Sequence, residues 1–262
     1  MITAFLFLIG LCIGSFLNVL IDRLSRGESI RGRSHCDRCK KTLMWKDLTP
    51  LVSFVFLRGR CRYCKEKLSW QYPIVELLTG LLFVFVYYAS INRFIDVDNI
   101  KLYQQIAFLI LNLVIFSGLI VIFFADLKYR IIPDEIVVVN TLAAIFLNFL
   151  VLKNDFWPYI LSALVLFLIF IVLVLLTRGR GMGMGDVKYV IFMGLFLGFP
   201  ASLIAFYASF LTGAVVSIIL IFIGRKKFGQ TIPFGPFLVL GTFVSIYWGN
   251  ELWTYFLKIL GV

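Results

Sequence analysis

The chain has 262 residues, 61% of them hydrophobic, and a formal net charge of +11. Its mean hydropathy is +0.98, and its hydrophobic share lies well above the roughly 45–50% of a soluble domain. These values exclude a soluble domain built around one water-driven core and favour a polytopic membrane protein. The positive charge predicts no nucleic-acid partner, because basic residues gather in the cytosolic loops of membrane proteins.

Eight apolar stretches predict an all-α polytopic membrane protein with about eight transmembrane helices and a small cytosolic zinc-binding loop domain. The predicted spans are residues 2–21, 73–91, 104–125, 136–152, 157–177, 187–199, 201–223 and 234–250. The first span lacks a basic segment before it and a small-residue cleavage site, so we interpret it as a retained helix. The sixth is short and glycine-rich, and its boundaries are weakly defined.

The distribution of basic residues predicts the orientation of these spans. The segments 22–72, 126–135, 178–188 and 224–233 alternate with the remaining loops and hold 21 of the 25 Lys and Arg residues. Because cytosolic loops are enriched in Lys and Arg, this side is predicted to be cytosolic and both termini external. Three parts follow: a first transmembrane helix (1–21), a polar cytosolic domain (22–72) and a membrane domain (73–262).

Two pairs of cysteines in the polar segment predict a metal site. Cys36 and Cys39 form one Cys-x-x-Cys knuckle, and Cys61 and Cys64 form a second after a spacer of 21 residues. Paired knuckles of this kind supply four thiolates to structural zinc. A disulfide pair and a thiol redox motif are the alternatives, but the cytosol keeps thiols reduced and two knuckles argue against redox chemistry. Cys12 is interpreted as a small buried apolar residue of the first span.

Two carboxylates lie at the margins of apolar runs. Asp126 ends the third span, and Asp186 opens the sixth within Gly183-Met184-Gly185-Asp186. Carboxylates at such margins are costly and indicate function, and two together can share a proton and activate water. The helix ends differ in electrostatic field, which predicts one ionised and one protonated partner. Asp134 is a competing acid that fits a helix cap better.

A break in the apolar pattern precedes the last span, at Ile232-Pro233-Phe234-Gly235-Pro236. Backbone groups freed by such a break are satisfied by protein or water rather than by lipid. The segment is therefore either the lining of a cavity near the cytosolic side or an ordinary loop, and the sequence favours neither.

The chain resembles the type IV prepilin peptidases, the bifunctional leader peptidase/N-methyltransferases. The resemblance rests on the following segments: residues 14–24, the four cysteines, residues 57–61, residues 71–76, residues 126–134, residues 183–188 and residues 232–237. It implies an enzyme of the bacterial inner membrane that removes the basic leader of prepilins or pseudopilins after a glycine. It also implies methylation of the new N-terminus by S-adenosylmethionine. The family's catalytic aspartates fall on Asp126 and Asp186, and a glycine associated with methyl transfer falls on Gly59. The resemblance thus implies that 73–262 is the membrane aspartyl peptidase domain and that the zinc-binding domain 22–72 is the methyltransferase part.

Other functions compete with this interpretation. A transporter would use the aspartates as ion or proton ligands, but no inverted repeat is visible and both aspartates lie at a margin. A membrane scaffold would leave the Gly-x-Gly-Asp motif unexplained. A peptidase without methyl transfer is the nearest alternative. Membrane lipid is an expected partner, and neither the oligomeric state nor the particular pilin substrate can be inferred.

Overall fold

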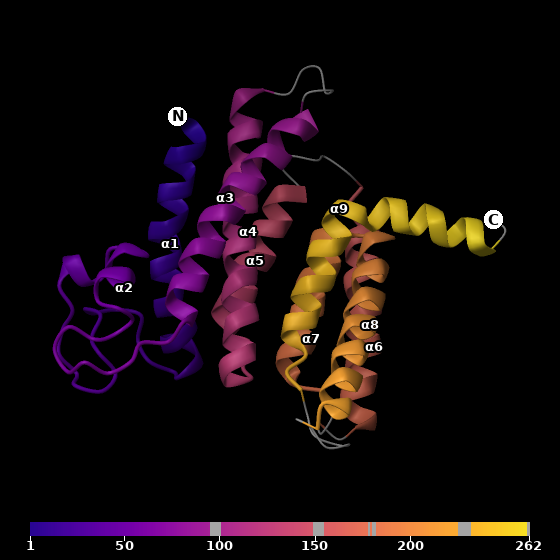
Figure 1. The fold of residues 1–262 in the computed structure, drawn as a ribbon. Coiled ribbons are helices and arrows are strands. Elements are labelled where there is room, and N and C mark those ends of the chain that lie inside the picture. Colours follow the sequence, from indigo (N-terminus) through magenta and orange to yellow (C-terminus); the bar gives the residue numbers. More distant parts are fainter. Residues whose placement is uncertain (95–100, 149–154, 178, 180–181, 225–231, 261–262) are drawn as a thin grey trace. The chain divides into compact units, whose positions relative to one another are not determined.

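The computed structural model describes residues 1–262 except 95–100, 149–154, 178, 180–181, 225–231 and 261–262. The end of the predicted span 136–152 and parts of the predicted cytosolic segments 178–188 and 224–233 therefore lie outside the described residues. Within the described parts the chain is helical, with two isolated β-bridges and no strand (Figure 1). The prediction of an all-α fold is confirmed for these parts.

A helix occupies each of the eight predicted spans. They are α1 (Ile2–Ser25), α3 (Gln71–Phe94), α4 (Leu102–Tyr129), α5 (Asp134–Phe146), α6 (Trp157–Leu176), α7 (Met184–Leu197), α8 (Ala201–Phe222) and α9 (Gly235–Leu260). Among the described residues, five of these are long and apolar enough to cross a bilayer: α1, α3, α4, α6 and α8. Helices α5 and α7 have 13 and 14 residues, fewer than the roughly 20 that a perpendicular span needs. The number of eight spans therefore stays a prediction.

The chain divides into two compact units, residues Met1–Val121 and Ile122–Val262. In the first unit, α1 and α3 pack closely because small residues face each other. A Cβ on Gly10 would lie 2.7 Å from the Cα of Gly80, and a Cβ on Gly14 would lie 2.7 Å from the Cα of Glu76. Such close approach of backbones is how membrane helices associate in the absence of a hydrophobic driving force. The division into residues 1–21, 22–72 and 73–262 remains a prediction about function.

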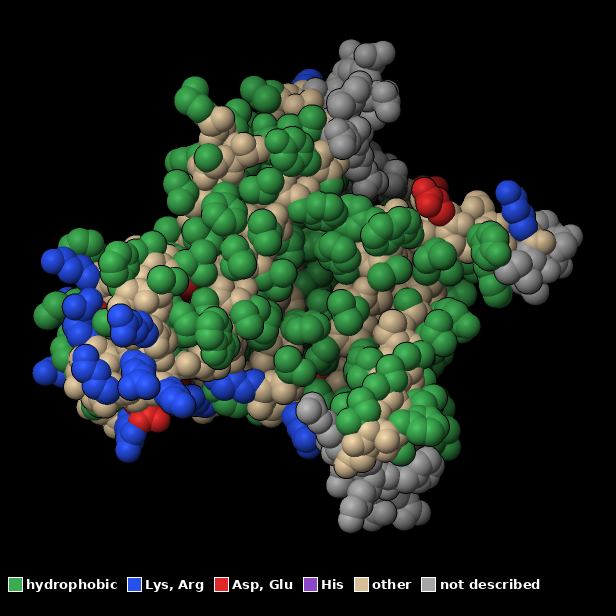
Figure 2. All heavy atoms as spheres, in the orientation of Figure 1, with side chains coloured by type: hydrophobic (Ala, Val, Ile, Leu, Met, Phe, Trp, Pro, Cys, Tyr) green, Lys and Arg blue, Asp and Glu red, His purple; other side chains and the backbone are tan. Residues whose placement is uncertain are grey.

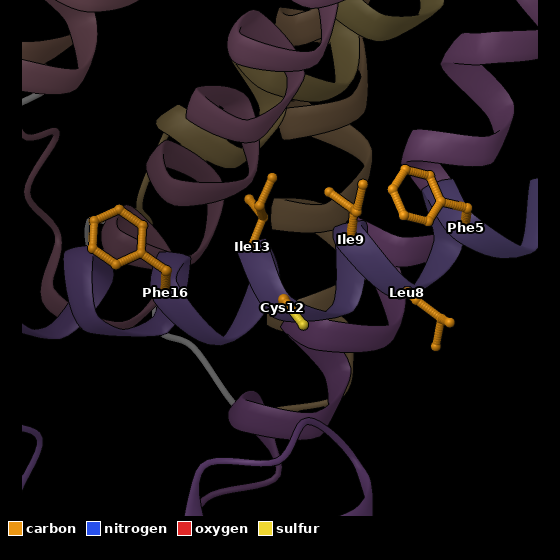
Figure 3. Close-up of a pocket in the computed structure, with 6 residues that line it drawn as sticks. All are labelled: Phe5, Leu8, Ile9, Cys12, Ile13 and Phe16. Carbon is orange, nitrogen blue, oxygen red and sulfur yellow. The ribbon is translucent and has the colours of Figure 1, made fainter. Parts of the chain in front are cut away.

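The outer face of α1 is apolar and open. Figure 3 shows a shallow hollow on this face, lined by Phe5, Leu8, Ile9, Cys12, Ile13 and Phe16. Cys12 is exposed there, so its expected burial is wrong. The physical reason is that an apolar residue of a membrane helix can face lipid as well as protein.

The second unit is built around α7. Tyr189, Phe192 and Met193 on this helix are fully buried, and the Tyr189 hydroxyl pairs with Thr242 of α9 at 2.9 Å. Gly194 allows α6 to cross closely, since a Cβ there would collide with the backbone of Ala163. Helix α7 therefore contacts the other helices of its unit mainly through buried side chains. The first turn of this helix contains Asp186.

Candidate active site and metal centre

Asp126 lies near the C-terminal end of α4 and is buried, with 6% of its surface exposed. Its Oδ2 accepts a hydrogen bond of 2.7 Å from the N–H of Gly235, the first residue of α9. A Cβ on Gly235 would lie 2.6 Å from that oxygen, so only glycine permits the contact. The N-terminus of α9 thus offsets the unfavourable field at the end of α4.

Gly235 is a site residue that the sequence did not single out. The apolar break at residues 232–236 was the available signal, but it did not separate a cavity lining from a loop. The structure places this break against Asp126, 109 positions away in the chain. This contact places Gly235 at the site, and the choice between a cavity lining and an ordinary loop stays open.

Asp186 lies in the first turn of α7 and is also buried, with 7% of its surface exposed. Its Oδ2 accepts a hydrogen bond of 3.1 Å from the N–H of Gly183, the residue that caps the helix. The carboxylate lies close enough to Asp126 for the two charges to interact. The structure therefore brings the two predicted aspartates together, each held at Oδ2 by the backbone of a glycine.

The glycine between these two positions has a packing role. A Cβ on Gly185 would lie 3.1 Å from the Cβ of Ile132, so the absence of a side chain lets the first turn of α7 lie against the segment that follows α4. The glycines of this motif thus serve different purposes. Gly183 supplies a hydrogen bond, and Gly185 supplies space.

Asp134 differs from Asp126 and Asp186 because its side chain is exposed and pairs with a lysine. Its side chain is 60% exposed and forms an ion pair of 2.6 Å with Lys188. Helix α5 begins at Asp134 after Pro133, and no side-chain cap bond is formed. Asp134 therefore does not cap α5 as expected. It lies in the first turn of α5, and its carboxylate forms an ion pair with Lys188 of α7.

The four cysteines of the polar segment 22–72 converge as predicted. The sulfur atoms of Cys36, Cys39, Cys61 and Cys64 all lie within 4.8 Å of one another, and all four thiols are free. The Cys36 and Cys64 sulfurs are 3.7 Å apart, close to the roughly 3.8 Å edge of a zinc tetrahedron with bonds of about 2.3 Å. The donor set therefore fits a structural zinc ion.

The two knuckles are built alike. Each begins after a β-bridge residue, with the bridges His35–Thr42 and Arg60–Lys67, and each turns through a lysine with positive φ, Lys40 or Lys65. The lysine N–H donates to the carbonyl of the first cysteine in both, at 2.9 and 3.0 Å. This repeated backbone turn is a local internal repeat that the sequence analysis missed.

The backbone of the second knuckle favours the thiolate of Cys61, whereas burial raises the pKa of the Cys64 thiol. The backbone N–H of Cys64, directed at the sulfur of Cys61, lowers the pKa of the Cys61 thiol to about 7, although burial acts in the opposite direction. Deprotonated sulfur is the form that binds zinc. In the first knuckle, the hydrogen bond that Arg26 donates to Asp37 lowers the pKa of the Asp37 carboxyl.

Gly59 lies between the short helix α2 (Val52–Phe56) and the second knuckle. Its φ is +65°, a left-handed conformation that favours glycine. A Cβ there would lie 3.1 Å from the tip of the Phe54 ring, which itself packs 5.1 Å from the Trp70 ring between centroids. The structure thus gives Gly59 a conformational role, and its relation to a methyl donor stays a prediction.

The first unit and the second unit together define a helical membrane protein with a buried pair of carboxylates and a four-cysteine cluster. Residues 113–218 match the type IV leader peptidase family, and residues 8–90 match the bacterial peptidase A24 N-terminal domain. The chain belongs to the type IV leader peptidase family.

Three relatives illustrate the similarity, and each is named prepilin leader peptidase/N-methyltransferase. The protein of Bacillus subtilis is 30% identical over 97% of this chain and 97% of its own length. That of Aeromonas salmonicida is 30% identical over 97% and 93%. That of Myxococcus xanthus is 38% identical over 83% of this chain, but only 62% of its own length is covered. No solved structure matches the chain.

Proposed function

We propose that this protein cleaves the basic leader peptide of type IV prepilins or pseudopilins after a glycine and then methylates the new N-terminal residue. The observation that carries the proposal is the pair of buried carboxylates, Asp126 and Asp186, each held by a glycine N–H. The names of the relatives support both the substrate and the two reactions.

The cleavage step follows from the chemistry of two interacting carboxylates. One ionised aspartate removes a proton from water, and the resulting hydroxide attacks the scissile carbonyl carbon. The other, protonated, aspartate hydrogen-bonds the carbonyl oxygen, and a proton then passes to the leaving amine as the C–N bond breaks. Because Oδ2 of each residue is held by backbone, Oδ1 is the oxygen that would face water and substrate.

The orientation of the spans supports a site on the cytosolic side of the bacterial inner membrane. A prepilin brings an apolar helix that lies in lipid and a basic leader that stays in the cytosol. The bond between the leader and the apolar helix would then lie at the membrane margin. Asp126, in the last turn of α4, and Asp186, in the first turn of α7, lie at the same margin in this proposal. Membrane depth thus contributes to the selection of the bond.

The zinc site has a structural role in this proposal. Four cysteine ligands leave no open position at which zinc could bind and activate water. Between residues 24 and 70 only Cys36 and Cys61 are buried, so the loop has almost no apolar core and metal binding stabilises its fold.

Methyl transfer is assigned to the loop edge around Gly59. S-adenosylmethionine supplies an electrophilic methyl group: its S–CH₃ bond breaks as the free amine forms an N–CH₃ bond. The neighbouring Phe54 and Trp70 rings offer faces that can attract a sulfonium cation. This assignment stands on the family resemblance and on the position of the loop.

Mass spectrometry of a co-expressed prepilin tests both reactions at once. We expect loss of the leader and a gain of one methyl group on the mature chain. Loss of the leader without the methyl group would support a peptidase alone, and an unchanged prepilin beside a folded protein would contradict the proposal and leave ion transport to be tested in proteoliposomes.

Substitution of Gly59 tests the site of methyl transfer. Gly59→Trp is expected to abolish methylation of a pre-cleaved pilin while leaving zinc content and most proteolysis intact. Gly59→Ala is the matched control, because it carries the same backbone strain with a small side chain. Loss of zinc in both variants would show that Gly59 only shapes the turn before the second knuckle.

A further inference from the structure

Helix α2 exposes apolar side chains on a strongly basic loop. Val52, Val55 and Phe56 are 49%, 73% and 83% exposed. In Figure 1, α2 lies at the end of the loop that is nearer the middle of α1, away from the C-terminal end of that helix. Figure 2 shows most of the Lys and Arg side chains over the lower part of the loop, with a basic side chain also at its upper edge beside apolar ones. The loop therefore carries apolar side chains bordered by basic ones.

A buried carboxylate fixes the depth of this segment. Glu76 is 8% exposed, and its Oε2 accepts a hydrogen bond of 2.8 Å from the N–H of Leu51, directly before α2. The Ser15 side chain hydrogen-bonds the same carboxylate. Glu76 lies about 7 Å along α3 from its first residue, and Ser15 lies about 15 Å from the end of α1. Leu51 is therefore held at a level inside both candidate spans.

Four N–H groups at the entry to this segment are paired within the protein. The N–H groups of Val52, Ser53 and Val55 donate to the carbonyls of Pro50, Thr49 and Leu51, at 2.6, 3.0 and 3.0 Å. The N–H of Leu51 precedes the helix and is satisfied by the Glu76 carboxylate. Hydrocarbon tolerates only backbone whose polar groups are paired within the protein, and these four N–H groups meet that requirement.

The flanks of the segment have the side chains of a membrane interface. Trp45 and Trp70 are 76% and 71% exposed, and Lys46 lies over the Trp45 ring at 5.4 Å. Arg58 is exposed immediately after α2. Exposed tryptophans with Lys or Arg beside an apolar helix are typical of segments that lie at the level of anionic headgroups.

We propose that the exposed face of α2, formed by Val52, Val55 and Phe56, inserts into the cytosolic leaflet of the bilayer, with Lys46 and Arg58 at anionic lipid headgroups. The inference is independent of the proteolytic chemistry, since the proposed function enters only in naming the leaflet. The consequence is that the loop edge bearing Gly59 is held at the membrane surface instead of moving freely in the cytosol.

Depth-dependent fluorescence quenching of the full-length, zinc-loaded protein in vesicles tests the insertion. Phe56→Trp places a reporter on the exposed face of α2, and Thr42→Trp places a matched reporter on the first zinc knuckle. The fluorescence of the protein without either substitution is subtracted. We expect lipids brominated in their acyl chains to remove more than about half of the signal added by Phe56→Trp and little of that added by Thr42→Trp.

Aqueous iodide should give the reverse order. Equal quenching of both reporters by iodide, in variants that retain zinc, would overturn the proposal. If Phe56→Trp fails to retain zinc, Val55→Trp provides the same measurement from the neighbouring exposed position. Vesicles of pure lipid contain no protein partner, so protection from iodide there cannot arise from another protein.

Two further comparisons test the anchor and the headgroups. Glu76→Ala should bring the Phe56→Trp reporter into contact with iodide, whereas Glu76→Gln retains a carbonyl acceptor for Leu51 and should preserve bromolipid quenching. Replacing part of the phosphatidylcholine by phosphatidylglycerol should increase bromolipid quenching, and the Lys46→Gln/Arg58→Gln double variant should remove that increase. No response to either change would contradict the anchor or the anionic contact, respectively.

Discussion

The zinc loop and the aspartate pair are assembled over different distances along the chain. Each zinc knuckle is made by a short turn, with the N–H groups of Lys40 and Lys65 returning to carbonyls four residues earlier. The aspartate pair depends on contacts between helices, because Asp126 is held by Gly235, 109 positions away. A site made of local turns tolerates changes elsewhere in the fold, whereas a site made between helices depends on how those helices pack.

The largest expected effect comes from removing either carboxylate. Asp126→Asn and Asp186→Asn should each abolish leader removal, because an amide can neither accept the proton of water nor share a proton with its partner. Cleavage of a co-expressed prepilin measures the effect, and zinc content and membrane insertion should be unchanged. Substantial cleavage by either variant would refute the paired mechanism.

Removal of the metal ligands should damage the first unit and spare the second. The Cys36→Ser/Cys61→Ser double variant is expected to lose its zinc ion and, with the loop unfolded, its methylation of pre-cleaved pilin. Metal analysis and a methyl-transfer assay measure these losses. Retention of one zinc ion per chain would contradict the four-cysteine site, and equal loss of proteolysis would show that the two regions are not separable.

Replacing glycine by alanine, which adds one methyl group, should affect the contact of Asp126 more than that of Asp186. Gly235→Ala places a Cβ 2.6 Å from Asp126 Oδ2 and should displace the carboxylate or α9, lowering the cleavage rate by about a hundredfold. Gly183→Ala is the matched control, since a Cβ there would lie 3.7 Å from Asp186 Oδ2, an ordinary contact. Cleavage rates of the two variants at equal protein content provide the test, and similar rates would show that the Gly235 contact is unimportant.

The smallest effect is expected at the exposed ion pair. Asp134→Asn removes the partner of Lys188, and both side chains are about half exposed, so we expect a change in stability of about 0–1 kcal/mol. Thermal unfolding in detergent measures this change, and cleavage should remain near normal. A loss of cleavage comparable with that of Asp186→Asn would mean that Asp134 belongs to the active site.

The sequence predicted the local features better than the packed ones. Apolar stretches located eight helices, and the spacing of the cysteines predicted their convergence, because both signals lie within short segments of chain. The number of true spans was not determined by hydropathy, since α7 is short and the end of the predicted span 136–152 lies outside the described residues. The roles of Gly235 and Glu76 could not be predicted, because each depends on which distant backbone N–H is brought to a carboxylate.

The burial of α7 has a consequence for how its unit fits a bilayer. Fourteen residues of α-helix extend about 21 Å, less than the roughly 30 Å of hydrocarbon in a typical membrane. A lipid-facing helix of this length would thin the bilayer around it or tilt its neighbours to relieve the hydrophobic mismatch. Because Val187, Val190 and Phe192 are covered by protein, α7 avoids that mismatch. The length of α7 can therefore be set by where Asp186 must lie, and the surrounding longer helices meet the thickness of the membrane.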